Sequence, residues 1–298
     1  MMAFFANIFG YVLNFMYNII GNYGIAIILF SILIKILMIP ISIKQQKTMK
    51  KSTKLQAKLK EIQVKYKGNP EKLNQETMEL YKKENMSPFS GCLSAIVQLI
   101  LLLAVFYLVK SPLTHMTKID AEVIDKYTTI MKQYEMSENT AYPEIELINE
   151  IDNIKKLKEE NKEENSEKIS VSEINNEELD SMKINMDFLG VNLAQVPTKS
   201  SDWKAYIIPV LYVLISIASM KITMATNPTT KKEKKEGEEE FDMAAQMNKN
   251  MTFMFPFIYV SVALIAPLGL ALYWLMNSLL LIIEKLILSK VIKEEEEE

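Results

Sequence analysis

Tyr23 to Ile43 reads YGIAIILFSILIKILMIPISI, an apolar stretch that contains one charged residue, Lys35. A helix rises about 1.5 Å per residue and a bilayer core is about 30 Å thick, so about 20 apolar residues span it. The stretch therefore predicts a transmembrane helix. An ammonium near its middle costs roughly 2.5–3.5 kcal/mol unless water or a partner meets it. Because Ser31 lies one helical turn before Lys35, this face predicts the wall of a hydrated cavity inside the membrane.

Apolar and charged residues are segregated along the chain, which is 49% apolar and 24% charged. The apolar blocks lie at roughly 23–43, 89–109, 205–224, 250–266 and 268–283. Their alternation with charged stretches is typical of a polytopic helical membrane protein. The predicted fold class is an all-α membrane protein of five transmembrane helices, with an N-terminal interfacial helix and a cytoplasmic helical hairpin.

The N-terminal region, residues 1–22, predicts an amphipathic helix that lies in the membrane interface. Apolar side chains recur at helical spacing, and Asn7, Asn14 and Asn18 gather on the opposite face. Gly21 and Asn22 then end the helix. The alternative is that residues 3–20 form a short extra span.

A basic segment follows the first span. Residues 44–86 hold twelve lysines against five glutamates, and Gly68, Asn69 and Pro70 supply a helix stop, an N-cap and a first-turn proline. We therefore expect a cytoplasmic helical hairpin, because the positive-inside bias places lysines in the cytoplasm. This orientation puts the N-terminus outside and the C-terminus in the cytoplasm. The hairpin is also expected to contact anionic lipids.

The remaining segments alternate between membrane and water. They are a second transmembrane helix at 87–110, an extracellular acidic and partly helical insert at 111–203, a third transmembrane helix at 204–225, a flexible cytoplasmic loop at 226–249, the fourth and fifth transmembrane helices at 250–290, and an acidic cytoplasmic tail at 291–298. The insert holds twenty acidic residues against ten lysines, so it belongs outside. The only histidine, His115, is expected to be an ordinary loop residue. The only cysteine, Cys92, excludes a disulfide framework and a cysteine-based metal site.

Five features in order resemble the YidC/Oxa/Alb family of membrane protein insertases. After the lysine-bearing first span and the basic hairpin come SPFSGCLSAIVQ (87–98), DFLGVNLAQ (187–195), IIPVL (207–211) and APLGLALYW (266–274). The likeness covers about residues 20–110 and 185–290. It implies a bacterial plasma membrane protein whose five-span core encloses a hydrophilic groove, open to the cytoplasm and to lipid but closed toward the outside.

The resemblance also implies where substrate is bound. Lys35 stands where most members have arginine, and Ser31 stands where threonine is common. In the third span, serines replace the usual glutamines. With polar residues of the second, third and last spans included, the predicted substrate-binding residues are Lys35, Ser31, Gln98, Ser216, Ser219, Tyr273 and Trp274. No metal and no cofactor is expected.

The implied partners are nascent membrane proteins, the ribosome and the Sec translocon, although the five glutamates of the tail would repel ribosomal RNA. The main alternative is a small ion or proton-coupled transporter that uses Lys35 as an intramembrane site. A passive membrane anchor is a third interpretation. The sequence shows no HExxH, GxSxG or phosphate-loop motif, so an enzyme is not expected. Lys35 could instead pair with Glu284, but the place of Glu284 near a cytoplasmic end argues against this pairing.

Overall fold

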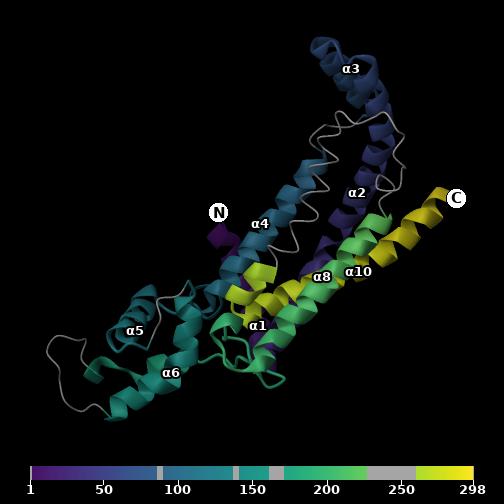
Figure 1. Cartoon of the computed structure of the whole chain (residues 1–298). Coiled ribbons are helices and arrows are strands. Elements are labelled where there is room, and N and C mark those ends of the chain that lie inside the picture. The colour runs from purple at the N-terminus through teal and green to yellow at the C-terminus, as the bar shows by residue number, and fades with distance from the viewer. Residues whose placement is uncertain (1, 86–89, 137–140, 161–170, 227–259, 298) are drawn as a thin grey trace.

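The computed structural model describes residues 2–85, 90–136, 141–160, 171–226 and 260–297. Within these ranges the fold is helical, apart from one antiparallel pair of two-residue strands. The long helices are α1 (Met2–Ile20), α2 (Tyr23–Lys65), α4 (Ser90–Lys110), α8 (Ile207–Thr226) and α10 (Leu268–Glu297). They pack side by side, with α10 against α8 and α2, and α1 against α4 and α2 (Figure 1). The predicted all-α class is confirmed.

Four of the described helices have the length and apolarity of a membrane span. These segments are Ala3–Ile20, Tyr23–Thr48, Trp203–Ile222 and Leu268–Leu288. The described apolar part of α4, Leu99–Lys110, is shorter. The predicted fourth span lies outside the described residues except for its last turns. The predicted loop at 226–249 also lies outside them, except for Thr226, which ends α8.

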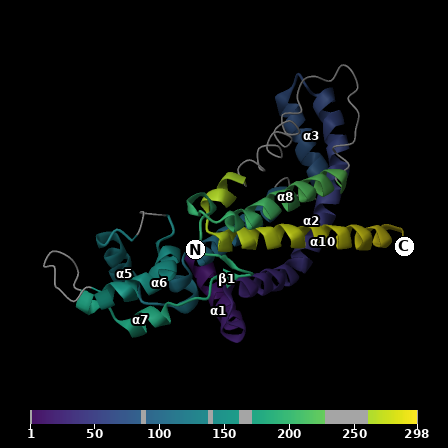
Figure 2. The ribbon, with the colours of Figure 1, turned by 60° about the horizontal axis from the view of Figure 1, so that its bottom comes forward.

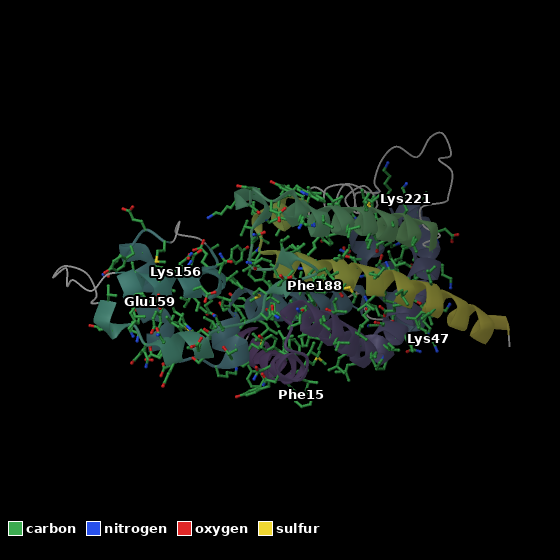
Figure 3. The ribbon with its side chains drawn as sticks, turned by 90° about the horizontal axis from the view of Figure 1, so that it is seen from below. Phe15, Lys47, Lys156, Glu159, Phe188 and Lys221 are labelled. Atoms are coloured by element: carbon green, nitrogen blue, oxygen red, sulfur yellow. The ribbon has the colours of Figure 1, made fainter. Side chains whose placement is uncertain are left out.

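Large apolar side chains on the outside of the bundle support a membrane setting. α2 exposes Ile36 and Leu37 by 56% and 58%, and α8 exposes Leu214 by 59%. On α1 the exposed apolar face includes Phe15, which points away from the ribbon in Figure 3. Contiguous apolar surface of this kind needs lipid or a partner to cover it. Its presence on three helices indicates that lipid surrounds the bundle.

The turn between α1 and α2 is held by a segment far away in sequence. The Asn22 side chain accepts the N–H of Ile25 and so caps α2, and it donates to the carbonyl of Asp187 at 2.6 Å. Asp187 belongs to β1 (Asp187–Phe188), which pairs with β2 (Val191–Asn192). Phe188 lies directly on Gly24, where an added Cβ would come within 2.5 Å of the ring. This position therefore requires glycine.

The same hairpin region holds the start of α10. The N–H of Leu268 donates to the carbonyl of Gln195, and the N–H of Gly269 donates to the carbonyl of Leu193, both at 2.9 Å. These bonds satisfy two of the orphan donors of a helix N-terminus. Thus the sequence motifs at 187–195 and 266–274 meet and tie together this end of the bundle.

At the opposite end, α2 continues from the apolar part into the basic hairpin without a break. It ends at Lys65, and α3 (Pro70–Lys83) begins after Asn69, whose side chain accepts the N–H of Lys72. Tyr66 donates to Glu76 at 3.0 Å and so links the two helices. Figures 1 and 2 place this hairpin at the end of the bundle away from the acidic insert.

The acidic insert forms a small helical unit. Its elements are the π-helix η1 (Leu113–Thr117), α5 (Ala121–Gln133), α6 (Pro143–Glu160), η2 (Val171–Glu173) and α7 (Asn176–Ser181), followed by η3 (Pro197–Lys199) and η4 (Trp203–Tyr206). Its core is apolar and includes Tyr127, Leu147, Ile154 and Leu179, all fully buried. These side chains belong to the same cluster of buried residues as the bundle, so the insert packs as a continuation of the main core.

The insert contacts the membrane bundle through η1 and α1. Gly10 approaches this π-helix so closely that an added Cβ would lie 1.8 Å from the carbonyl oxygen of His115. His115 is 7% exposed, and its Nδ1 is 2.9 Å from Oδ1 of Asn7. The prediction of an ordinary loop histidine is wrong, because this packing buries the ring and gives it a hydrogen-bond partner. Burial also lowers the pKa of His115.

Candidate intramembrane charge site

Lys35 forms an ion pair with Glu284 of α10. The two side chains are 18% and 9% exposed, so the pair is largely, but not wholly, shielded by protein. Lys35 lies twelve residues after Tyr23, or about 18 Å along α2, which is within the thickness of a bilayer core. The prediction that Lys35 is an unpaired charge is therefore wrong. It failed because the pairing depends on how α2 and α10 pack: Glu284 reaches Lys35 although it lies only four residues before the end of the apolar segment Leu268–Leu288.

A second lysine belongs to the same site. Lys285 follows Glu284 in α10 and lies close enough to both Glu284 and Lys35 for electrostatic interaction. By formal charge the three side chains are two cations and one anion, an excess of one positive charge. The sequence interpretation missed Lys285. The dipeptide Glu284-Lys285 inside an otherwise apolar run was the pattern that could have revealed it.

Ser31 is near Lys35 but its hydroxyl is engaged within its own helix. It donates to the carbonyl of Ile27 at 2.7 Å, and the residue is 4% exposed. The donor of a serine hydroxyl that bonds to its own helix backbone is already satisfied without a ligand. Its hydroxyl must break this bond, or share it, to reach a substrate.

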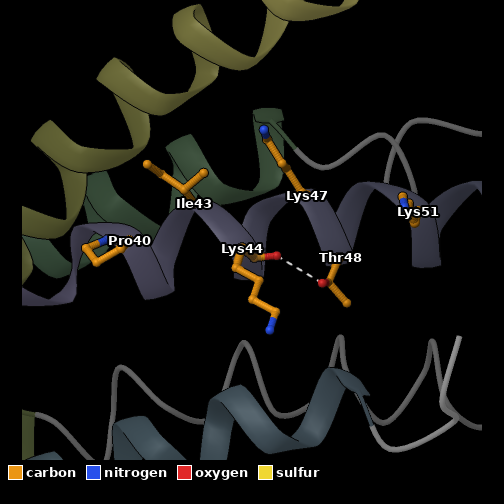
Figure 4. A pocket seen from close by; sticks show the side chains of 6 residues that line it. All are labelled: Pro40, Ile43, Lys44, Lys47, Thr48 and Lys51. Atoms are coloured by element: carbon orange, nitrogen blue, oxygen red, sulfur yellow. Dashed lines mark hydrogen bonds between the residues drawn. The ribbon is translucent and has the colours of Figure 1, made fainter.

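A cavity lies on the hairpin side of Lys35. It has a volume of about 370 Å³ and is lined by Pro40, Ile43, Lys44, Lys47, Thr48 and Lys51 (Figure 4). Pro40 is five residues beyond Lys35, so the cavity begins about 7 Å farther along α2. Thr48 donates to the carbonyl of Lys44 at 2.9 Å. Three lysines thus extend the positive charge from the intramembrane pair toward the basic hairpin.

The predicted serines of the third span lie on the buried side of α8. Ser219 is 8% exposed, and the hydroxyl of Ser216 is buried without a hydrogen bond to the described residues. A buried hydroxyl without a partner costs free energy. The side chain of Gln98 is outside the described part of the structure.

Tyr273 and Trp274 lie near the start of α10. Tyr273 is 2% exposed and belongs to the hydrophobic core, whereas Trp274 is half-buried and stacks at a tilt on Tyr212 of α8, with 6.1 Å between ring centroids. Ten residues separate Trp274 from Glu284, about 15 Å along the helix. The two aromatic residues therefore join α10 to the bundle and lie away from the charge pair.

Comparison with known proteins identifies relatives. The 60Kd inner membrane protein family matches residues 15–296. The "Membrane protein insertase YidC" of Caldanaerobacter subterraneus is 41% identical over 110 residues, which are 37% of this chain and 53% of that protein. Its namesake in Fusobacterium nucleatum is 44% identical over 101 residues, covering 34% of this chain and 49% of that protein.

In Chlorobium limicola a protein of this name is 45% identical over 100 residues, covering 34% of this chain and 17% of that protein. The aligned region thus spans about half, or less, of the length of these relatives. The family match, in contrast, extends over nearly the whole chain and includes both Lys35 and Glu284. It agrees with the apolar bundle described above, so this multi-pass membrane protein belongs to the 60Kd inner membrane protein family.

Proposed function

We propose that this chain is a membrane protein insertase, which draws hydrophilic tails of nascent membrane proteins into a positively charged intramembrane groove and releases their apolar spans into lipid. The observation that carries the proposal is the charge site of Lys35, Glu284 and Lys285 among helices of membrane-spanning length. The relatives from Caldanaerobacter subterraneus and Fusobacterium nucleatum, which are named as insertases, support the same activity.

The chemistry of this step is solvation, and no covalent bond changes. A polar tail that crosses hydrocarbon loses its hydrogen bonds to water, at a cost of several kcal/mol for each unsatisfied group. At an effective dielectric constant near 20, an opposite charge 4 Å away contributes about 4 kcal/mol. This is comparable to the roughly 3 kcal/mol cost of inserting one aspartate at the centre of a membrane helix. An excess positive charge at this depth therefore lowers the barrier for acidic tails.

The cavity beside Lys44, Lys47 and Lys51 gives the tail a hydrated approach from the hairpin side. Once the tail has entered, the apolar span that follows it partitions into lipid, which drives the step forward. The exposed apolar faces of α2, α8 and α10 are the surfaces along which the span leaves. The groove residues in this proposal are Lys35, Ser31, Gln98, Ser216 and Ser219, with Tyr273 and Trp274 in the supporting packing.

The proposed orientation places the N-terminus outside and the C-terminus in the cytoplasm. The basic hairpin and the end of α10 lie at one end of the bundle, and the acidic insert lies at the other (Figures 1 and 2). Lysine-rich segments stay in the cytoplasm, which supports this assignment. The hairpin then faces anionic lipid headgroups, the ribosome and the Sec translocon, which are the partners we propose.

Reconstitution into lipid vesicles tests the proposal. A single-span substrate with a hydrophilic acidic tail is added, and tail translocation is measured by protease protection. We expect translocation well above that in protein-free vesicles. Equal protection in both preparations would contradict the insertase proposal, and a protein-dependent ion or proton flux in the same vesicles would favour the transporter alternative.

A further inference from the structure

Glu284 places a buried carboxylate against Lys35, which a hydrophilic groove does not by itself require. It is the only acidic residue in the apolar segment Leu268–Leu288, and its carboxylate meets Lys35 from another helix. At 9% exposure it is the more buried member of the pair, and its Oε2 is fully shielded from solvent. The ammonium of Lys35 is thus occupied when no substrate is present.

We propose that Glu284 is a resident counter-ion that an acidic residue of the incoming tail must replace on Lys35, so that the pair sets the preference for acidic tails. This inference rests on the proposed insertase function and names the residue that controls its specificity. Glu284 then acts as a positioning and specificity residue.

The physical basis is the cost of an unpaired charge in an apolar environment. Glu284 supplies a carboxylate partner for Lys35 at rest, because an ammonium without a partner is expensive among lipid tails and apolar side chains. Exchanging one carboxylate for another keeps an ion pair on Lys35 throughout. A neutral polar tail cannot make this exchange, so it leaves the resident pair in place.

The charge of Lys285 favours the exchange. It interacts electrostatically with Glu284 and with Lys35, and the described side chains at the site carry one positive charge in excess. A carboxylate from the substrate therefore brings the formal charge of the site to neutrality. Specificity arises because acidic tails compete with Glu284 whereas neutral tails do not.

The test uses the full-length protein in lipid vesicles and two substrates, a single-span peptide with an aspartate-containing tail and the same peptide with asparagines. The measured quantity is the ratio of their insertion rates. Glu284→Gln removes the competing carboxylate while keeping the side-chain size, so the acidic-to-neutral ratio should rise about tenfold. A ratio that stays unchanged or falls would overturn the inference.

Two variants control for indirect effects. Glu79→Gln removes one exposed negative charge on α3 and should leave the ratio unchanged. In the Lys35→Ala background, Glu284→Gln should no longer raise the ratio, and a rise that persists there would also overturn the inference. Should Glu284→Gln fail to fold, Glu284→Asp shortens the reach to Lys35 and should raise the ratio by a smaller factor, whereas an unchanged ratio would count against the counter-ion role.

The two proposals fail in different ways. If the unmodified protein inserts neither substrate above the level of protein-free vesicles, the insertase function itself is contradicted. If it inserts both and Lys35→Ala selectively slows the acidic one, but Glu284→Gln has no effect, only the counter-ion role is contradicted.

Discussion

The ion pair between Lys35 and Glu284 joins two helices that are also fixed to each other at their starts. Tyr23, the first residue of α2, packs beside Gly269 at the beginning of α10, where an added Cβ would lie 3.4 Å from its ring. Backbone hydrogen bonds from Leu268 and Gly269 hold the same end. The charged contact therefore lies at a defined depth, because both helices are anchored at one end and run from there in the same direction (Figures 1 and 2).

Lys35→Ala should impair insertion of acidic tails and destabilise the protein by about 3 kcal/mol, because the substitution leaves Glu284 buried without its partner. Lys35→Arg should retain both activity and stability, since arginine keeps the charge. Insertion in vesicles and thermal unfolding in detergent measure the two effects.

A paired substitution separates these two contributions. Lys35→Ala combined with Glu284→Ala removes both charges, so stability should recover while insertion of acidic tails stays impaired. Full recovery of insertion in this double variant would show that the charge pair is only structural.

Gly10→Ala should destabilise the contact between α1 and η1. The added methyl group would lie 1.8 Å from the carbonyl oxygen of His115, so the helices must separate. Overpacking of this kind costs about 1–3 kcal/mol, which a lowered thermal midpoint in detergent would report. Gly68→Ala is the matched control, because an added Cβ there has no heavy atom within 4 Å. An equal loss of stability in both variants would contradict the packing argument.

The stability of the acidic insert should depend on pH through Glu178. A hydrogen bond from Lys126 lowers the pKa of this carboxyl below its ordinary value of 4.5, and Tyr127 donates to the same oxygen at 2.9 Å. A carboxylate with a lowered pKa stabilises the folded state above its ordinary pKa, and this contribution is lost as the pH falls through the lowered value. Glu178→Gln should therefore cost about 1 kcal/mol at pH 7 and progressively less as the pH falls below 4.5.

Thermal unfolding at a series of pH values measures this difference. Glu159→Gln, at an exposed position of α6 (Figure 3), should show no comparable pH-dependent loss. A Glu178→Gln deficit that is constant from neutral to acidic pH would contradict the assignment.

Deleting the tip of the basic hairpin, Gly68 to Pro70, should slow insertion without unfolding the bundle. The tip joins α2 and α3 far from the packed ends of α2 and α10, so the contacts that hold the bundle remain. Insertion rate and thermal midpoint in detergent are the measurements. A normal rate after the deletion would restrict the hairpin to a role in topology.

The acidic tail provides a separate test. Removing Glu294 to Glu298 should not reduce ribosome association in a sedimentation assay, because five carboxylates repel ribosomal RNA. A clear loss of association would contradict this electrostatic argument.

The fold could be predicted from local patterns. Apolar runs of span length and the Gly68-Asn69-Pro70 turn determine the structure of their own segments and do not depend on distant residues. The partner of Lys35 could not, since pairing depends on how α2 and α10 pack. Glu284 was visible in the sequence near the end of an apolar run, and only the packing of α10 against α2 brings it to Lys35. Ser31 shows the same limit, because the sequence cannot tell whether a hydroxyl faces a groove or its own helix.

The insert shows where tertiary structure overrides local expectation. His115 lies in a polar stretch, yet the close approach at Gly10 buries it. In the sequence, Gly10 and Gly24 cannot be distinguished from other small residues in an apolar helix. Only the close contacts with His115 and Phe188 explain why glycine is needed at these two positions.

The most direct test of the central claim asks whether water reaches position 35 and whether a positive charge there is needed for insertion. In a Cys92→Ser background, Lys35→Cys removes the ammonium, and an aqueous aminoethyl methanethiosulfonate reagent restores one through a disulfide. Insertion of an acidic-tailed substrate in vesicles is measured before and after treatment. We predict that treatment restores insertion toward the rate of the Lys35 protein; a thiol that stays unmodified in the folded protein, or one that is modified without any gain in insertion, would contradict the account.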